Sequence, residues 1–473
     1  MDYTMTRRIP IEEGYDLVVA GGGPAGCAAA ICAARLGVKV LLAETMGSLG
    51  GMGTSGLVAA FDPMADGERM LVGGYMRELI EEMFKRGFLK PGINPDAWRK
   101  SYMVWIPFHP EGLKLVLDQW CRESGVDVRF FCKVIDADVD AGKTEIRGVV
   151  LHQAEGYRYI KAKTFIDCTG DAVLASLCGA ECLEAGRDTA NIMPPTLCSL
   201  HANINWENDT TCHAHEEDGL ARPTSRWRNI QKEALILAIE KNHFTIPNRH
   251  IAGGLVRIGE TIGYMNTGHE YKTDALNCHS LSQAMMLGRR LAREYLEFYR
   301  TYIPGCEQME IVTTAALLGV RESRRIVGEY KLSIEDYLAR RQFPDQIGIF
   351  NKFVDTHPYD SSLEEWQRFQ QEKTRDCLRQ GECFGIPYSI LVPRGWSNLW
   401  VAGRCNSSDL KVHGAIRVMP AAAMMGQAAG TAAVQSLRTG QPANDLDTEQ
   451  LVLTLRENGA NLPQENLSKN MTR

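Results

Sequence analysis

The sequence predicts an α/β fold in which a Rossmann-like parallel sheet with a β-meander carries an inserted α+β region. Three observations predict this class. A strand, a glycine turn and a helix of small residues follow one another in 15–44, short strand patterns fill 126–171, and a buried strand and helix return in 398–437. The chain between the last two regions has no βαβ rhythm and is richer in His, Trp, Arg and Tyr.

The first unit, YDLVVAGGGPAGCAAAICAARLGVKVLLAE, has the pattern of a dinucleotide-binding βαβ motif. Gly21 would permit a tight turn, Gly23 would let a pyrophosphate approach the backbone, and Gly26 would let the helix pack on the strand. The helix N-terminus offers free amides and a positive dipole end to phosphates. Glu44, at the end of the second strand, would accept hydrogen bonds from ribose hydroxyls, which favours FAD or NAD over NADP.

Length, charge and cysteine content limit the possible functions and partners further. A chain of 473 residues is long enough for two or three domains, and a net charge of −6 gives no basic surface for nucleic acid. Its 14 cysteines include no Cys-x-x-Cys, so we expect reduced thiols in a cytoplasmic protein and no metal site. The N-terminus lacks the apolar core of a signal peptide. The apolar run 16–34 is broken by glycines and a proline, which indicates a buried strand and helix and no membrane span.

Local patterns predict the remaining elements. An amphipathic helix is expected over 111–125, where a glycine ends it. The runs VDVRFF, KVIDADVD, EIRGVVLH and YRYIKAKTFIDCTGD predict an antiparallel meander that leads into a buried strand. A long helix is expected over 280–302 and a short buried strand over 398–404. Pro420 is then expected as the first residue of a thin helix whose N-terminus could face a flat ligand.

The glycine fingerprint, the CTGD segment and VAGR…MPAAAMMGQAAG together resemble the FAD-dependent oxidoreductases of the glutathione-reductase-like superfamily. The segment GVRESRRIVGEYKLSIEDYL is similar to the bacterial FAD-dependent oxidoreductase group within it. The resemblance covers nearly the whole chain and is weakest over about 201–252. It implies FAD as cofactor and an FAD-binding domain that is interrupted along the chain by the two parts of a substrate or cap domain. The implied FAD-binding parts are 1–60, 110–185 and 395–445, the implied substrate or cap parts are 61–109 and 186–394, and 446–473 would be a C-terminal tail.

The resemblance also implies which residues contact FAD. Those assigned to the pyrophosphate are Gly21, Gly22, Gly23, Pro24, Ala25 and Gly26, with Glu44 on the adenosine ribose. Those assigned to the rest of the cofactor are Gly51 and Met52 toward the ribityl chain, Val134 at the adenine, Gly170 and Asp171 over the nucleotide, Gly403 and Arg404 at the ribityl chain, and Met419 and Pro420 at the isoalloxazine. Arg404 departs from the wider superfamily, which usually has an acid there.

Four residues are candidates for catalysis. Arg321 could clamp an anionic substrate, although ion pairs between domains are the favoured interpretation of the dense cluster Arg321, Arg324 and Arg325, which cannot all face one ligand. His413 could act as acid or base and Arg417 could hold an anion, because both precede the helix expected to face the flavin.

His357 is the fourth candidate. Asp355 lies two residues before it and could orient the imidazole, although a loop histidine is more often a plain hydrogen-bonding residue. The triplet Trp105-Ile106-Pro107 is similar to part of the flavin-dependent halogenase signature. Met103 stands where that signature has its first tryptophan, so halogenase activity is not expected.

The sequence therefore predicts an FAD-dependent dehydrogenase or reductase that transfers a hydride between FAD and a small organic substrate. The candidate arginines would favour an anionic substrate. Two alternatives stay open at this point: a flavoprotein of RNA modification, which the acidic charge balance disfavours, and a non-catalytic binding protein on a flavin fold. No nucleic-acid or membrane partner is expected, and a homo-oligomer is left open.

Overall fold

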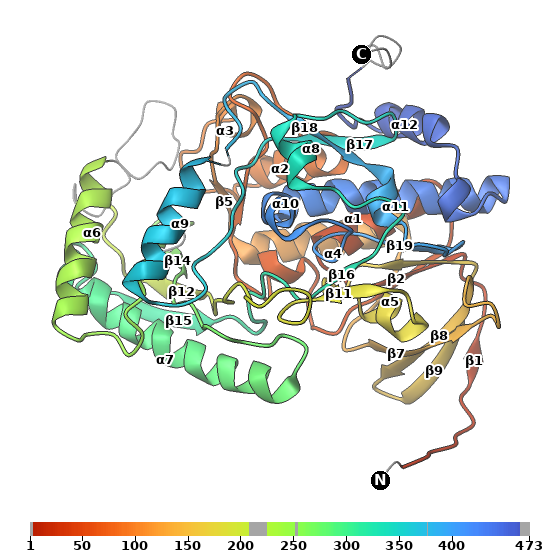
Figure 1. Cartoon of the computed structure of the whole chain (residues 1–473), viewed down its shortest axis with the longest axis horizontal. Coiled ribbons are helices and arrows are strands. Elements are labelled where there is room, and N and C mark those ends of the chain that lie inside the picture. The colour runs from red at the N-terminus through yellow and green to blue at the C-terminus, as the bar shows by residue number, and fades with distance from the viewer. Residues whose placement is uncertain (1–2, 208–224, 251–253, 376, 464–473) are drawn as a thin grey trace.

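A five-stranded parallel sheet forms the centre of the computed structural model, which describes residues 3–207, 225–250, 254–375 and 377–463 (Figure 1). Its strand order is β19-β10-β2-β3-β6. The strands, in that order, are Leu399–Val401, Thr164–Asp167, Leu17–Ala20, Val40–Ala43 and Asp127–Arg129. Helix α1 (Pro24–Arg35) crosses from β2 to β3, and α4 (Pro110–Ser124) precedes β6. The Rossmann-like sheet predicted from the sequence is confirmed.

A second sheet is the β-meander, at the lower right in Figure 1. Strands β7 (Lys133–Val139), β8 (Ile146–Gln153) and β9 (Gly156–Lys161) pair antiparallel, and β1 (Ile11–Glu12) adds parallel to β9. The prediction that VDVRFF begins the meander is wrong, because this run forms β6 beside β3 in the parallel sheet. The physical reason is α4, which supplies the crossover that a parallel strand requires.

The middle of the chain builds a separate antiparallel sheet with order β13-β14-β12-β15. The strands are Gly254–Arg257, Gly263–Asn266, Ser199–Ala202 and Glu310–Thr314. The long helix α7 (Cys278–Tyr302), with α6 (Ser225–Glu240) and α9 (Leu363–Arg375), lies with this sheet at the left of Figure 1, far from the meander. This region has a core of its own around Trp206, Tyr295 and Phe298. The inserted α+β region is thus confirmed.

Shorter elements connect these layers. They are β4 (Ala60–Phe61), α2 (Gly74–Lys85), α3 (Asp96–Arg99), β5 (Ile106–Pro107), α5 (Val173–Cys178), β11 (Cys182–Glu184), β16 (Arg324–Ile326), α8 (Ile334–Leu338), β17 (Gln346–Phe350), β18 (Phe384–Pro387), α10 (Leu410–Ile416) and α12 (Thr448–Glu457), with the 3-10 turns η1 (Gly51–Gly53), η2 (Tyr388–Leu391) and η3 (Ala443–Asp445). Helix α12 packs on α11, with Leu451 and Leu455 buried, so 446–473 is more than the expected tail; its residues 464–473 lie outside the described part. The proposed domain boundaries stay a prediction.

Helix α11 (Met419–Thr439) lies along α1 at very short distance. A Cβ added to Gly426 would stand 2.0 Å from the carbonyl oxygen of Ala25, so only glycine allows this approach. The helix begins at Met419, which makes Pro420 the second helical residue and not the first. The N-termini of α1 and α11 meet as a result. No helix in the described part of the chain has the length and apolar character to cross a membrane.

Candidate functional site

The turn after β2 brings three glycines to the N-terminus of α1. Gly21 has a φ of +95°, and a Cβ there would stand 2.6 Å from the carbonyl oxygen of Cys168 on the neighbouring β10 segment. A Cβ on Gly26 would stand 1.7 Å from the oxygen of Gly21, so helix and turn are in direct contact. Around Gly23, by contrast, an added Cβ meets no atom within 4 Å. Open space therefore faces the backbone exactly where the helix begins, between Gly22 and Pro24.

Glu44 places a buried carboxylate beside this turn. Its side chain accepts hydrogen bonds from the backbone amides of Gly22 at 2.6 Å and Met46 at 2.7 Å. The residue is 6% exposed. It also accepts from the hydroxyl of Thr45 at 3.2 Å. A carboxylate has about four acceptor positions, so about one, on Oε2, remains for a ribose hydroxyl.

Two further segments close around the same space. The backbone of Gly50 donates to the carbonyl of Gly22 at 2.8 Å, and a Cβ on Gly51 would stand 2.9 Å from the Cα of Gly23. Met52 follows in the same 3-10 turn. Gly403, with a φ of +93°, lies between the two helix N-termini, because its added Cβ would approach both Ala25 and Ala422.

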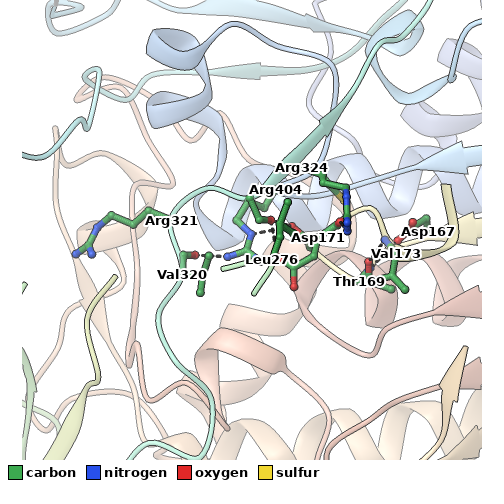
Figure 2. Close-up of polar contacts among 12 residues, drawn as sticks. Asp167, Thr169, Asp171, Val173, Leu276, Val320, Arg321, Arg324 and Arg404 are labelled. Carbon is green, nitrogen blue, oxygen red and sulfur yellow. Dashed lines mark hydrogen bonds and ion pairs between the residues drawn. The ribbon is translucent and has the colours of Figure 1, made fainter. Parts of the chain in front are cut away.

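Arg404 joins three segments at the edge of this space (Figure 2). Its guanidinium donates to the carbonyl of Gly170 at 2.8 Å, to the carboxylate of Asp171 at 2.5 Å and to the carbonyl of Val320. Asp171 also accepts from the hydroxyl of Ser323. The Arg404 guanidinium therefore links its own segment to those of Gly170 and Val320. Its contact with the ribityl chain stays a prediction.

The other predicted cofactor residues lie in two places. Val134 is buried in β7, where its backbone pairs with Leu151 of β8. Met419 and Pro420 form the buried start of α11. The structure thus brings the glycine turn, the 50–53 turn, Gly403 and the start of α11 together, while Val134 lies in the meander.

A polar cluster of Asp355, His357, Arg417, Arg321 and His413 lies beside the start of α11, and we call it the buried polar cluster. Its histidines and Arg321 are buried, while Asp355 and Arg417 are half-buried. The Asp355 side chain is 3.2 Å from Nη2 of Arg417 and 3.7 Å from Nε2 of His357. Burial alone would raise the pKa of Asp355, but the charge of Lys352, the contact with His357 and the charge of Arg417 hold this pKa well below its usual range. Nε of Arg417 is buried and has no hydrogen-bond partner among the described residues. Asp355 is therefore a carboxylate that positions two of the four predicted catalytic residues.

Arg321 and His413 join the same cluster. Arg321 donates to the carbonyl of Pro194 and to the hydroxyl of Thr196 at 3.1 Å, and burial lowers its pKa to about 10, so it remains charged at neutral pH. Nε2 of His413 is 3.1 Å from the carbonyl oxygen of Arg321 and donates to it. Burial, with the nearby charge of Arg325, holds the pKa of His413 well below its usual range. His413 is therefore neutral and holds the backbone of Arg321 in place.

The neighbouring arginines behave differently. Arg324 pairs with Glu184 at 3.0 Å, and Arg325 pairs with Asp188 at 2.5 Å. Figure 2 shows the Arg321 side chain pointing away from the Arg324 and Arg404 side chains. The ion-pair interpretation of the cluster therefore fits Arg324 and Arg325, and Arg321 alone is directed elsewhere.

Sequence reasoning missed two features of this cluster. One is His269, whose Nε2 lies 3.0 Å from Nδ1 of His357. The other is the buried pair of Lys352 and Asp62, 2.5 Å apart. Both join segments that are far apart in the chain, and no local spacing in the sequence signals them.

Comparison with known proteins gives the chain its family. The model of the family described as FAD dependent oxidoreductase matches residues 16–455. The chain belongs to this family. A segment of 45 residues is also 56% identical to dihydrolipoyl dehydrogenase of Trypanosoma brucei brucei, and this match spans 10% of the chain but only 9% of that protein.

Two solved structures show more distant similarity over most of the chain. A geranylgeranyl bacteriochlorophyll reductase-like protein from Thermoplasma acidophilum is 12% identical with a TM-score of 0.45, over 94% of this chain and 83% of that one. The p-nitrophenol 4-monooxygenase PnpA of Pseudomonas putida is 11% identical with a TM-score of 0.42, over 94% and 81%.

The residues present fit FAD, the cofactor of this family. The open space at Gly23 matches the room that a pyrophosphate needs against a helix N-terminus. The buried carboxylate of Glu44 stands where a ribose would lie beyond that pyrophosphate. The start of α11 would present a second positive helix end to the other end of the cofactor. When bound, FAD supplies a two-electron acceptor or donor.

Proposed function

We propose that the protein transfers a hydride between FAD and a small organic anion that binds at the buried polar cluster before α11. The observation that carries this proposal is a pair of arginines, the buried Arg321 and the partly buried Arg417. Each lies within two residues of a segment that borders the proposed FAD site. Arg417 precedes Met419 by two residues, and Arg321 follows Val320, whose carbonyl is bound to Arg404.

The arginines have capacity for a further anion. Arg417 is engaged through Nη2 with Asp355, while its Nε is buried without a hydrogen-bond partner in the described part of the chain. A buried unsatisfied donor costs about 1–3 kcal/mol, which a carboxylate or similar group would recover. Guanidinium groups bind carboxylates in a planar, directional way, so the cluster would also orient the substrate.

Side chains of the protein would neutralise the anionic group of the substrate during the reaction. In the oxidative direction, bound FAD would supply the acceptor for the hydride, with both electrons, of a substrate C–H bond, and the proton of the adjacent O–H, N–H or C–H group would pass to a base or to water. Arg321 and Arg417 would keep the anionic group fixed during this step. His413 would act as a positioning residue, because its proton is already donated to the backbone of Arg321.

The superfamily and the cellular location of the protein are also proposals. We infer membership of the glutathione-reductase-like superfamily from the glycine fingerprint and the CTGD and VAGR segments. A cytoplasmic location is inferred from the 13 cysteines of the described residues, which form no disulfide with one another.

The test is anaerobic flavin bleaching with a panel of small carboxylates. The active compound should bleach the 450-nm flavin band of the purified protein, and Arg417→Lys should raise its KM about 10- to 100-fold at unchanged flavin content. Arg394, which is exposed, provides the matched control in Arg394→Lys. Unchanged KM in Arg417→Lys would refute the assignment of the anion site.

A further inference from the structure

Three histidines from separate segments converge at one end of the buried polar cluster. His250 precedes β13, His269 follows β14, and His357 lies in the segment between β17 and α9. Among the described residues they form the one group of three His, Cys, Asp or Glu side chains placed to hold a metal ion, with a ligand atom from each within 4.8 Å of the others. His269 and His357 are buried, and His250 is half-buried.

The three imidazole rings lie in mutual contact. The ring centroids of His269 and His357 are 4.9 Å apart at 83°, and those of His250 and His357 are 5.1 Å apart at 82°. The rings of the third pair, His250 and His269, are stacked, with centroids 5.3 Å apart at 23°. Nδ1 of His357 and Nε2 of His269 are 3.0 Å apart.

These separations are close to those of a metal site. Zinc–nitrogen bonds of about 2.0–2.1 Å with tetrahedral angles place ligand nitrogens about 3.3 Å apart. The pair of His269 and His357 therefore needs almost no adjustment. His250 would move inward by about 1–2 Å to complete the set, and as the half-buried member of the group it has the most room to do so.

The surroundings are those of a metal site as well. Asp355 lies 3.7 Å from Nε2 of His357, on the ring edge opposite the nitrogen that faces His269. A carboxylate on the outer nitrogen of a histidine ligand fixes the ring and its tautomer. The rings of Trp366 and Phe369 contact the His250 ring, with centroids 5.8 Å and 5.1 Å away, and add apolar surface beside it.

We propose that His250, His269 and His357 bind a divalent first-row transition metal ion, with zinc as the reference ion and a fourth position open to an oxygen ligand. Imidazole ligands suit zinc, copper, nickel and iron, and three protein ligands leave a tetrahedral ion one free position. Arg321 carries a positive charge near this cluster and Asp355 a negative one, so the carboxylate offsets the guanidinium. The inference concerns residues outside the FAD cradle and does not depend on the proposed reaction.

The test uses the full chain, purified without a histidine tag and freed of metal with a chelator. The protein is incubated with zinc chloride and desalted, and bound zinc is counted by mass spectrometry alongside FAD content and thermal midpoint. We expect about one zinc per chain in the unmodified protein, and less than about a tenth of that in His269→Ala and His250→Ala. Asp355→Asn should weaken zinc binding about 10- to 100-fold.

His279 is exposed on α7 and gives the matched control, His279→Ala, which should bind zinc like the unmodified protein. If His269→Ala does not fold, the half-buried His250→Ala decides the question, because its thermal midpoint and FAD content report folding independently. Absence of zinc from the unmodified, FAD-containing protein would overturn the metal site and leave the FAD assignment intact. Full zinc retention in a folded His250→Ala would overturn it too.

Discussion

Substitution of Gly23 by alanine should separate cofactor binding from folding. The backbone of Gly23 is extended, with φ −70° and ψ −172°, so alanine adopts it without strain. An added Cβ meets no protein atom within 4 Å. Gly23→Ala should therefore change the free energy of unfolding of the FAD-free protein by less than about 1 kcal/mol.

The same methyl group would occupy the space where a pyrophosphate must approach the α1 amides. Displacing the phosphates from two charge-assisted hydrogen bonds, at about 1.5 kcal/mol each, costs about 3 kcal/mol. This corresponds to a loss of FAD affinity of about 100-fold. The assay is titration of the FAD-free protein with FAD, followed by flavin fluorescence, together with urea unfolding of the FAD-free form.

Two further glycine variants serve as comparisons for Gly23→Ala. Gly26→Ala places its Cβ 1.7 Å from the carbonyl oxygen of Gly21, so it should damage both folding and FAD binding. Gly259 lies in the hairpin between β13 and β14, where an added Cβ meets only the Ile262 side chain, at 3.3 Å. Gly259→Ala should therefore leave FAD affinity unchanged and alter the free energy of unfolding by no more than about 1 kcal/mol. FAD affinity within a few-fold of the unmodified protein in Gly23→Ala would refute the placement of the pyrophosphate.

Three further outcomes follow from the packing. Gly426→Ala would bring a Cβ to 2.0 Å from the oxygen of Ala25, so α1 and α11 must separate; we expect a loss of about 1–3 kcal/mol in urea unfolding together with release of flavin. The hydrogen bond from Arg129 lowers the pKa of Glu12 below 4.5, so this pair stabilises the fold above that pH and loses its effect as the pH falls. Glu12→Gln should therefore cost up to about 1 kcal/mol at pH 7 and less at pH 4, and an equal cost at both would contradict the pairing. Arg404→Lys keeps the charge but loses the planar fork, and should lower the unfolding free energy by about 2 kcal/mol in the same assay.

The local parts of the cofactor cradle could be predicted from the sequence. The turn at Gly21, the start of α1 and the carboxylate of Glu44 lie within one βαβ unit, where spacing along the chain fixes spacing in space. Helix α11 was found for the same reason, because its small residues and proline carry a local signal, although its first residue is Met419.

The polar cluster could not be predicted, because it is assembled by tertiary packing. Asp355 contacts Arg417 across 62 positions of the chain, and His269 contacts His357 across 88. Periodicity and spacing describe one segment at a time and do not say which loops meet. The same limit explains Arg404, whose bonds to the segments of Gly170 and Val320 leave no trace in its own neighbourhood.

The most direct test of the account is the absorbance spectrum of the purified protein before and after acid precipitation. We predict flavin bands with about one FAD per chain, in the supernatant if the cofactor is non-covalent and in the pellet if it is attached. A folded protein that is colourless and stays so after incubation with FAD would contradict the central claim that Gly23, Glu44 and the start of α11 form an FAD site.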